Sequence, residues 1–355
     1  MQSDKEGFAY PVVDTKQCTN CGLCEKVCPV INQQPQRQPI ATYAATNSNE
    51  AVREQSSSGG IFTLLAEETI NKGGIVFGAS FNEKWAVEHT FADNIDDIKK
   101  FRGSKYVQSN IGNSYAAAEK FLKEGKEVLF SGTPCQIAGL KRFLRKEYKN
   151  LKTVDFVCHG TPSPLVWKKY LEEVCCANKI GNITDIQFRN KAEGWKIFSF
   201  VIKYTNNEGI EQVFRETMEE NLFMKCFLSD LCLRPSCYKC PARNGKSDSD
   251  ITLGDLWGAE YICPEIDDDC GLSLVLQRKE CEFPPCDKIE ISYSEALKYN
   301  PSIERDVHKP QRRRKFFRLF HKNGDRKATQ TCTTQSKFEI IWKKIVWNIK
   351  NRILK

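Results

Sequence analysis

The sequence has no apolar run near the roughly 18 residues of a membrane-spanning helix, and its first ten residues, MQSDKEGFAY, lack the apolar core of a secretory signal. Both absences predict a cytoplasmic protein. Cysteine, by contrast, is abundant, with 17 residues in a chain of 355. Thiols in a reducing compartment are more often metal ligands or redox groups than disulfides. We therefore expect metal or redox chemistry.

The formal net charge of +8 argues for a nucleic-acid partner only if the charge is spread over the fold. Much of it lies in the last 50 residues instead, so it characterises a tail. The hydrophobic fraction of 40% and the charged fraction of 28% are those of a globular protein. We expect no nucleic-acid partner.

The cysteines are densest near the N-terminus, where Cys18, Cys21, Cys24 and Cys28 precede Pro29. Their spacing, C-x2-C-x2-C-x3-C-P, is the one that holds a 4Fe-4S cluster in bacterial-type ferredoxins. A disulfide pair or a zinc knuckle is the alternative, but zinc sites usually show two separated cysteine pairs. The spacing therefore predicts one N-terminal 4Fe-4S cluster.

Strands alternate with helices between residues 40 and 175. ATYAAT, IVFGASF, EVLF and TVDFVC have the composition of strands, and helices are predicted at 61–72, 111–122 and 136–146. This alternation predicts a mostly parallel sheet covered by helices. Residues 183–217 alternate apolar and polar residues around an NNEG turn, which predicts an antiparallel portion.

These patterns predict an α/β fold class, α+β in part, with three regions. They are an N-terminal ferredoxin-like cluster segment (residues 1–35), a mixed-sheet domain with an antiparallel portion (36–300) and a basic helical tail (301–355).

Two polar loops could bind an anion. Residues 55–60, QSSSGG, lie between a strand and a helix, where free backbone N–H groups and the helix dipole favour phosphate. Residues 102–106, RGSKY, bring two cations into a second loop, suited to a pyrophosphate or an anionic reduced flavin. A simple helix cap and a solvated basic loop are the alternative interpretations.

Further cysteines follow predicted strands. Cys135 lies at the start of a helix after EVLF, and Cys158 ends TVDFVC. Because the carboxyl ends of adjacent parallel strands face one crevice, we expect these two thiols to meet. Each could be a metal ligand, a reactive thiol or an inert buried cysteine. Cys232, Cys237 and Cys240 match the spacing of a plant-type two-iron ferredoxin, but no ferredoxin-like strand pattern surrounds them.

Six blocks in order give the chain a family resemblance between about residues 5 and 320. They are SSSGGIF, RGSKYVQS, FSGTPCQIAGLK, VDFVCHGTPSPLVW, FRNKAEGW and CYKCPARNGKSDSDITLGDLWG. Together they resemble the coenzyme F420 hydrogenase/dehydrogenase beta-subunit family. The resemblance implies a bound FAD in the mixed-sheet domain and 4Fe-4S clusters. It makes FAD-contact candidates of Ser58, Gly59, Gly60, Arg102, Ser104 and Lys105, and it places Cys135, Cys158, Cys237 and Cys240 as candidates for one internal cluster.

The implied activity is electron transfer from a ferredoxin-like donor or partner subunit, through the clusters, to FAD. A hydride would then pass to a small-molecule conjugated substrate, deazaflavin-like or of unknown type. Two other classes stay open: a non-catalytic iron–sulfur carrier subunit and a zinc-stabilised binding protein. No catalytic residue is assigned; His159 is a candidate, and a structural histidine is the alternative.

The chain departs from the family in carrying one C-x2-C-x2-C-x3-C-P run where such proteins usually carry two. In two-cluster ferredoxins the fourth cysteine of each run ligates the other cluster. We expect either that the true start lies upstream or that Cys28 closes a single cluster.

The C-terminal region combines cations with apolar residues at helical spacing. Residues 312–315 are all basic and precede Phe316, Phe317, Leu319 and Phe320. A second stripe is formed by Phe338, Ile341, Trp342, Ile345, Val346, Ile349 and Ile353, beside Lys343, Lys344, Lys350 and Arg352. The pattern suits peripheral contact with an anionic membrane or a partner's acidic groove, and equally a helix docked on its own domain.

Overall fold

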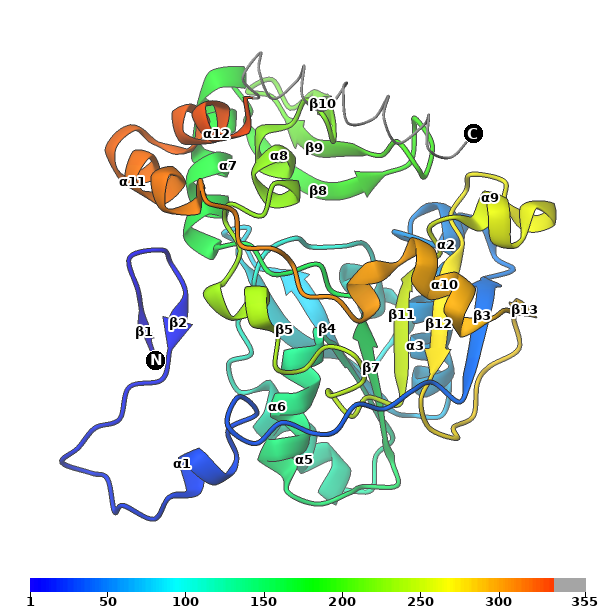
Figure 1. Ribbon diagram of the computed structural model, residues 1–355. Helices are drawn as coiled ribbons and strands as arrows, with labels where there is room; N and C mark the ends of the chain where they lie inside the picture. Colours follow the sequence, from blue (N-terminus) through cyan, green and yellow to red (C-terminus); the bar gives the residue numbers. More distant parts are fainter. Residues whose placement is uncertain (335–355) are drawn as a thin grey trace, which may run out of the picture.

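The computed structural model describes residues 1–334, and its largest element is an eight-stranded sheet (Figure 1). From one edge to the other its strands are β13 (Asp287–Glu290), β3 (Ala41–Thr46), β12 (Ser273–Gln277), β11 (Ile251–Asp255), β7 (Leu151–Phe156), β6 (Val128–Gly132), β4 (Ile75–Phe81) and β5 (Val87–Ala92).

The sheet is mixed, and only its centre is parallel. Strands β11, β7, β6 and β4 run parallel, whereas β5 at one side and β12, β3 and β13 at the other are antiparallel to their neighbours. The prediction of a mostly parallel sheet is therefore wrong for the flanks. Strand β3 comes first in the predicted series, but it pairs with β12 and β13, which lie more than 200 residues later in the chain. Local periodicity carries no information about such a partner.

Both faces of the parallel centre are buried, as expected for parallel strands. Alternate residues such as Val76, Leu129 and Val154 pack under α3 (Ile61–Asn71), and Phe77 and Phe130 pack on the other face. That second face is covered by α5 (Ser114–Lys123) and α6 (Pro134–Leu144). Each of the three predicted helices of this region is present, with shifts of a few residues at its ends.

A second layer lies beyond the carboxyl ends of the central strands (top of Figure 1). It contains the antiparallel strands β8 (Asn182–Asn190), β9 (Ser199–Thr205) and β10 (Glu211–Thr217), with α7 (Pro164–Asn178) and α8 (Leu222–Leu228). The predicted NNEG turn joins β9 to β10, and Gly209 takes a φ of 79° there. Phe81, at the end of β4, stacks on Trp167 and Phe188 and joins this layer to the main sheet.

The N-terminal segment is mostly irregular. It forms a two-stranded hairpin of β1 (Gln2–Ser3) and β2 (Ala9–Tyr10), followed by the single turn α1 (Leu23–Lys26). The remaining short elements are α2 (Glu50–Glu54), α4 (Ile95–Ile98), η1 (Lys99–Phe101), η2 (Pro235–Lys239), α9 (Ala259–Ile262), η3 (Pro264–Ile266), α10 (Tyr293–Tyr299) and η4 (Pro301–Ile303).

The basic segment at residues 312–320 packs against the rest of the protein. Helix α11 (Arg313–Asn323) buries Phe316, Phe317 and Phe320 in the core of the second layer, and α12 (Asp325–Thr333) packs beside it. The docked alternative therefore holds for this piece. The second predicted stripe, 338–353, lies outside the described residues. No helix within residues 1–334 is long and apolar enough to cross a membrane.

Candidate metal and cofactor site

The N-terminal cysteine run forms an exposed loop. Cys18, Cys21 and Cys24 are exposed and Cys28 is half-buried. Gly22 takes a φ of 69°, a left-handed conformation that turns the chain into α1. This turn directs the backbone N–H groups around it toward sulfur.

Two of those N–H groups reach the thiols. The amide of Asn20 donates to Cys18 Sγ at 3.4 Å. Hydrogen bonds from the Leu23 amide and from Thr19 lower the pKa of Cys21. Because donors of this kind favour a thiolate over a thiol, the loop suits an iron–sulfur cluster.

The internal cysteines come from three separate parts of the chain. Cys135 is the second residue of α6, directly after β6, and Cys158 lies two residues past β7. Cys237 lies within η2 and Cys240 immediately follows it. Since β6 and β7 are adjacent and parallel, the thiols of Cys135 and Cys158 reach the same edge of the sheet, as predicted.

Hydrogen bonds hold two of these sulfurs. Thr133, the N-cap of α6, places its Oγ1 at 3.2 Å from Cys135 Sγ. The amide of Thr161 donates to Cys237 Sγ at 3.4 Å. Both contacts fix the direction in which the sulfur points, and a thiolate that accepts one hydrogen bond keeps other lone pairs for a metal.

The internal thiols raise one another's pKa. Burial raises the pKa of Cys158 well above its usual value, and the sulfurs of Cys237, Cys135 and Cys240 add to that effect. The pKa of Cys135 is raised as well, by the protein packed near its exposed side chain and by the sulfurs of Cys240 and Cys237. Four neighbouring thiols cannot all ionise unless a cation compensates them, and a cluster of iron ions supplies that charge.

These donors fit an iron–sulfur cluster by chemical type, since all four are cysteine sulfurs. Within residues 1–334, no three or more Cys, His, Asp or Glu side chains already have the spacing of a metal centre. The sulfurs are therefore gathered at one edge without the tight arrangement of bound metal.

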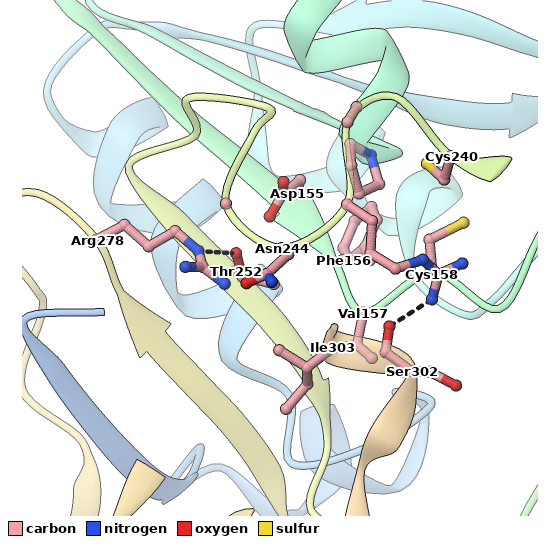
Figure 2. A pocket seen from close by; sticks show the side chains of 14 residues that line it. Asp155, Phe156, Val157, Cys158, Cys240, Asn244, Thr252, Arg278, Ser302 and Ile303 are labelled. Atoms are coloured by element: carbon pink, nitrogen blue, oxygen red, sulfur yellow. Dashed lines mark hydrogen bonds between the residues drawn. The ribbon is translucent and has the colours of Figure 1, made fainter. Parts of the chain in front are cut away.

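A recess of about 320 Å³ adjoins two of these cysteines (Figure 2). Cys158 and Cys240 line one end of it, and the buried Asp155 and the half-buried Asn244 line its interior. Asp155 Oδ1 and Asn244 Oδ1 have no hydrogen-bond partner in the described part of the chain. Two buried acceptors of this kind suit ordered water.

The serine-glycine loop lies at the same edge of the sheet, where β3 ends. Ser58 Oγ donates to the Leu272 carbonyl at 2.8 Å, and the Gly59 amide donates to Ser273 Oγ at 2.9 Å. A Cβ on Gly59 would collide with the carbonyl oxygen of Ala45. Gly60 caps α3 with a φ of 84°, and the first amides of α3 have no acceptor within their own helix.

The RGSKY loop contacts the serine-glycine loop directly. The Ser104 amide donates to Ser57 Oγ at 2.6 Å. Arg102 is already engaged, through Gln55 Oε1 at 3.0 Å and Glu67 at 3.7 Å. The structure therefore brings together the two loops that were predicted separately.

Lys105 is the second cation of this loop, and its hydrogen bonds go to backbone carbonyls. Its Nζ donates to the carbonyl of Arg102 at 3.0 Å and to that of Gly103 at 3.3 Å, and the charge of Asp185 acts on it as well. Burial lowers the pKa of Lys105 to about 8. A half-buried cation in a loop that contacts the serine-glycine loop suits the pyrophosphate or the reduced ring of a flavin nucleotide.

Lys191 is a residue that the sequence patterns missed. Its Nζ donates at 2.8 Å to each of three carbonyls, those of Arg53, Ser58 and Cys270. Burial lowers the pKa of Lys191 to about 8, and Arg53 and Arg189 lower it further. Lys191 belongs to the FRNKAEGW block, so the family resemblance was the one available signal.

Neighbours of Lys191 form a compact aromatic and ionic group. Arg189 pairs with Asp255 and lies over the ring of Trp257 at 5.3 Å. Trp257 stacks on Trp195 with ring centroids 5.2 Å apart. This group fixes the end of β8 against β11 at the carboxyl edge.

His159 has a structural role in the described chain. Its Nε2 lies 2.6 Å from Asp230 Oδ1, and its ring packs edge-on against Phe227. Both contacts tie the loop after β7 to the end of α8.

The sheet, the exposed cysteine loop and the internal cysteine group define an α/β iron–sulfur protein. A sequence profile described as "4Fe-4S binding domain" matches residues 11–30, which include Cys18, Cys21, Cys24 and Cys28. The chain belongs to the coenzyme F420 hydrogenase/dehydrogenase beta-subunit family. The profile of that subunit's N-terminal part matches residues 42–114, and the profile of its C-terminal part matches residues 125–282.

Two characterised relatives are distant. A subunit of the F(420)H(2) dehydrogenase of Methanosarcina mazei is 24% identical over 144 residues, which is 40% of this chain and 39% of that protein. Coenzyme F420-dependent sulfite reductase of Methanocaldococcus jannaschii is 25% identical over 208 residues, 55% of this chain and 33% of that protein. The matches thus span two fifths or less of these relatives' length.

A chain of the F420-reducing [NiFe] hydrogenase complex from Methanosarcina barkeri is similar in structure, with a TM-score of 0.45 and 17% identity. The match covers 70% of this chain and 78% of that one.

Proposed function

We propose that this protein is an iron–sulfur flavoprotein oxidoreductase. Electrons from a ferredoxin-like donor or a partner subunit would pass through 4Fe-4S clusters to FAD. They would leave as a hydride to a small conjugated substrate.

One observation supports this most strongly: both candidate cofactor regions lie at the carboxyl edge of one sheet. Strands β6 and β7 carry Cys135 and Cys158 there, and β3, which runs in the same direction, delivers the serine-glycine loop. The carboxyl ends of strands in open α/β sheets are where ligands bind. A carrier that only stores electrons would not need an anion site beside its cysteines.

The number of electrons that each group transfers explains why FAD would lie between the clusters and the substrate. Iron–sulfur clusters exchange single electrons, and a hydride carries two, so a flavin that accepts singly and donates a pair connects them.

The chain's own residues would bind and orient this group. The first amides of α3 and the ammonium of Lys105 would hold the pyrophosphate or the reduced ring, and Ser104 would keep their two loops together through Ser57. Lys191 would fix the shape of the serine-glycine loop through the Ser58 carbonyl.

The substrate class is proposed from the relatives. Both characterised relatives bear the name of coenzyme F420, a deazaflavin, so a deazaflavin is the first candidate. The relative named as a subunit supports a partner subunit here as well.

Anaerobic purification followed by iron, sulfide, zinc and FAD analysis tests the proposal. We expect iron, sulfide and FAD together, and oxidation of the dithionite-reduced protein by oxidised F420 in single turnover. Iron and sulfide without FAD would point to a carrier subunit. Zinc in a colourless protein would contradict the proposal altogether.

A further inference from the structure

The N-terminal segment contacts the rest of the protein through two regions, of which residues 8–10 are the first. Phe8 is fully buried. Arg234 Nη2 donates to the Ala9 carbonyl at 3.0 Å, and its guanidinium lies over the ring of Tyr10 at 4.3 Å. Arg234 precedes Cys237 by three residues, so this fastening is made to the loop that carries the internal cysteines.

The second contact region is residues 32–37. Arg142 Nη2 donates to the Asn32 carbonyl at 2.6 Å, and Lys246 Nζ donates to Gln33 Oε1 at 3.2 Å. Arg37 pairs with Asp248 at 2.9 Å. We call residues 32–37 the strap; Figure 1 shows it crossing α6 on its way to β3.

The strap brings the two cysteine loops together. Pro29, which follows Cys28, and Pro241, which follows Cys240, line one recess of about 260 Å³. The Asn32 amide also donates to the Cys28 carbonyl at 2.9 Å, so the strap holds the end of the N-terminal cysteine run directly.

Helix α6 sets the separation between the two groups. Cys135 lies at its start, and Arg142, which grips the strap, follows seven residues later on the same face. Seven residues of α-helix rise about 10.5 Å. Arg142, which binds the Asn32 carbonyl, therefore lies about two helical turns from Cys135.

Positive charge gathers at this junction. Lys141, Arg142 and Lys246 line the recess between Pro29 and Pro241, and the one carboxylate that the recess shares with them, Asp248, is paired with Arg37. Cations near a cluster favour its reduced, more negative state, because the potential depends on the surrounding charge. The junction therefore favours the arrival of an electron.

We propose that the strap is an electron-transfer junction, with Arg142 and Lys246 as positioning residues that dock the N-terminal cluster segment against the internal cysteine group. This rests on the proposed function, since both groups must hold clusters. With clusters bound, one electron would leave the N-terminal group, which would be oxidised, and would reach the internal group, which would be reduced. No bond or proton would change in this step, and a low-potential one-electron donor would reduce the N-terminal group again.

The test compares the wild type with the double variant Arg142→Ala/Lys246→Ala. Each lost charge-assisted hydrogen bond lowers the docked population about tenfold relative to the released one. We expect unchanged iron and FAD content and weaker magnetic coupling between the two reduced clusters in EPR spectra. Flavin reduction after mixing with a reduced ferredoxin should slow about tenfold or more. The matched control is Lys120→Ala, an exposed cation of α5.

Unchanged coupling and an unchanged rate in the double variant, with iron retained, would overturn the inference. If the double variant fails to hold iron, the wild type decides: coupling between its two reduced clusters supports the junction, and independent EPR signals overturn it. A wild type without iron would instead contradict the proposed function itself. The two failures are therefore distinguishable.

Discussion

The N-terminal cysteines are surrounded by residues close to them in the sequence, whereas the internal cysteines are surrounded by distant parts of the chain. Cys21 lies in an exposed loop, and backbone and side-chain hydrogen bonds from residues two positions away lower its pKa. Burial by distant parts of the chain raises the pKa of Cys158. A short loop can therefore prepare a thiolate by itself, whereas the internal group depends on the whole fold and on the charge of a bound metal.

The largest expected effect is the loss of one cluster while the other is retained. Cys24→Ser and Cys158→Ser should each remove roughly half of the iron, because each disrupts one set of four thiolates. Only Cys158→Ser should also lower the melting temperature, since its surroundings are buried. Iron analysis and thermal unfolding measure both quantities.

The matched control for this pair is Cys176→Ser, an exposed cysteine of α7, which should retain all iron. Full iron retention in Cys158→Ser would show that the internal cysteines do not ligate a cluster. Equal melting temperatures for Cys24→Ser and Cys158→Ser would show that the internal cysteines contribute no more to stability than the exposed N-terminal ones.

The next largest expected effect is a loss of stability when Phe8, which anchors the N-terminal hairpin, is truncated. Phe8 has 0% exposure, and Phe8→Ala should lower the free energy of unfolding by about 3 kcal/mol, the usual cost of emptying a buried aromatic site. Chemical denaturation measures this cost, and hydrogen exchange should show weaker protection of β2. A loss below about 0.5 kcal/mol, the range of surface substitutions, would mean that the hairpin is not anchored through this residue.

The same contrast explains what the sequence could predict. The N-terminal run is recognisable because all its ligands lie within eleven residues, and its spacing alone indicates the cluster. The placement of Cys135 and Cys158 at one edge of the sheet follows from the geometry of adjacent parallel strands, and β6 and β7 are indeed neighbours. Cys237 and Cys240 have no such local cause, and only the family resemblance connected them to the others.

Long-range pairing limits prediction in the rest of the fold as well. The composition of β3 indicates a strand, but nothing in it indicates partners at residues 273–290. Lys191 contacts carbonyls from three distant loops, so no spacing could reveal it. The basic piece around Phe316 was correctly recognised as amphipathic, but only the folded structure shows which surface covers it.

The affinity for FAD should fall about tenfold per pH unit above pH 8, and this dependence should distinguish the anion site from the cysteine loops. Burial lowers the pKa of Lys105 to about 8 from an ordinary value of 10.5. Because the folded pKa lies below the unfolded one, the charged lysine destabilises the fold below pH 8. This penalty disappears as the pH rises from 8 to 10.5.

Binding should show the opposite trend: FAD affinity should fall above pH 8 as Lys105 loses its proton. Lys105→Met should bind FAD more weakly at pH 7 and lose this dependence, whereas Lys120→Met, an exposed lysine, should retain both. Fluorescence titration of FAD against pH measures it. An identical pH profile for the wild type and Lys105→Met would exclude Lys105 from the anion site.

The smallest expected effect lies in the exposed part of the N-terminal segment. Val13 is 56% exposed and Ile31 is 66% exposed, so neither side chain packs against the rest of the chain. Val13→Ser and Ile31→Ser should each change the free energy of unfolding by less than about 0.5 kcal/mol. Chemical denaturation checks both, with Phe8→Ala as the buried counterpart. A loss above about 1 kcal/mol would show that this loop is packed like the internal group, and the contrast between the two regions would then fail.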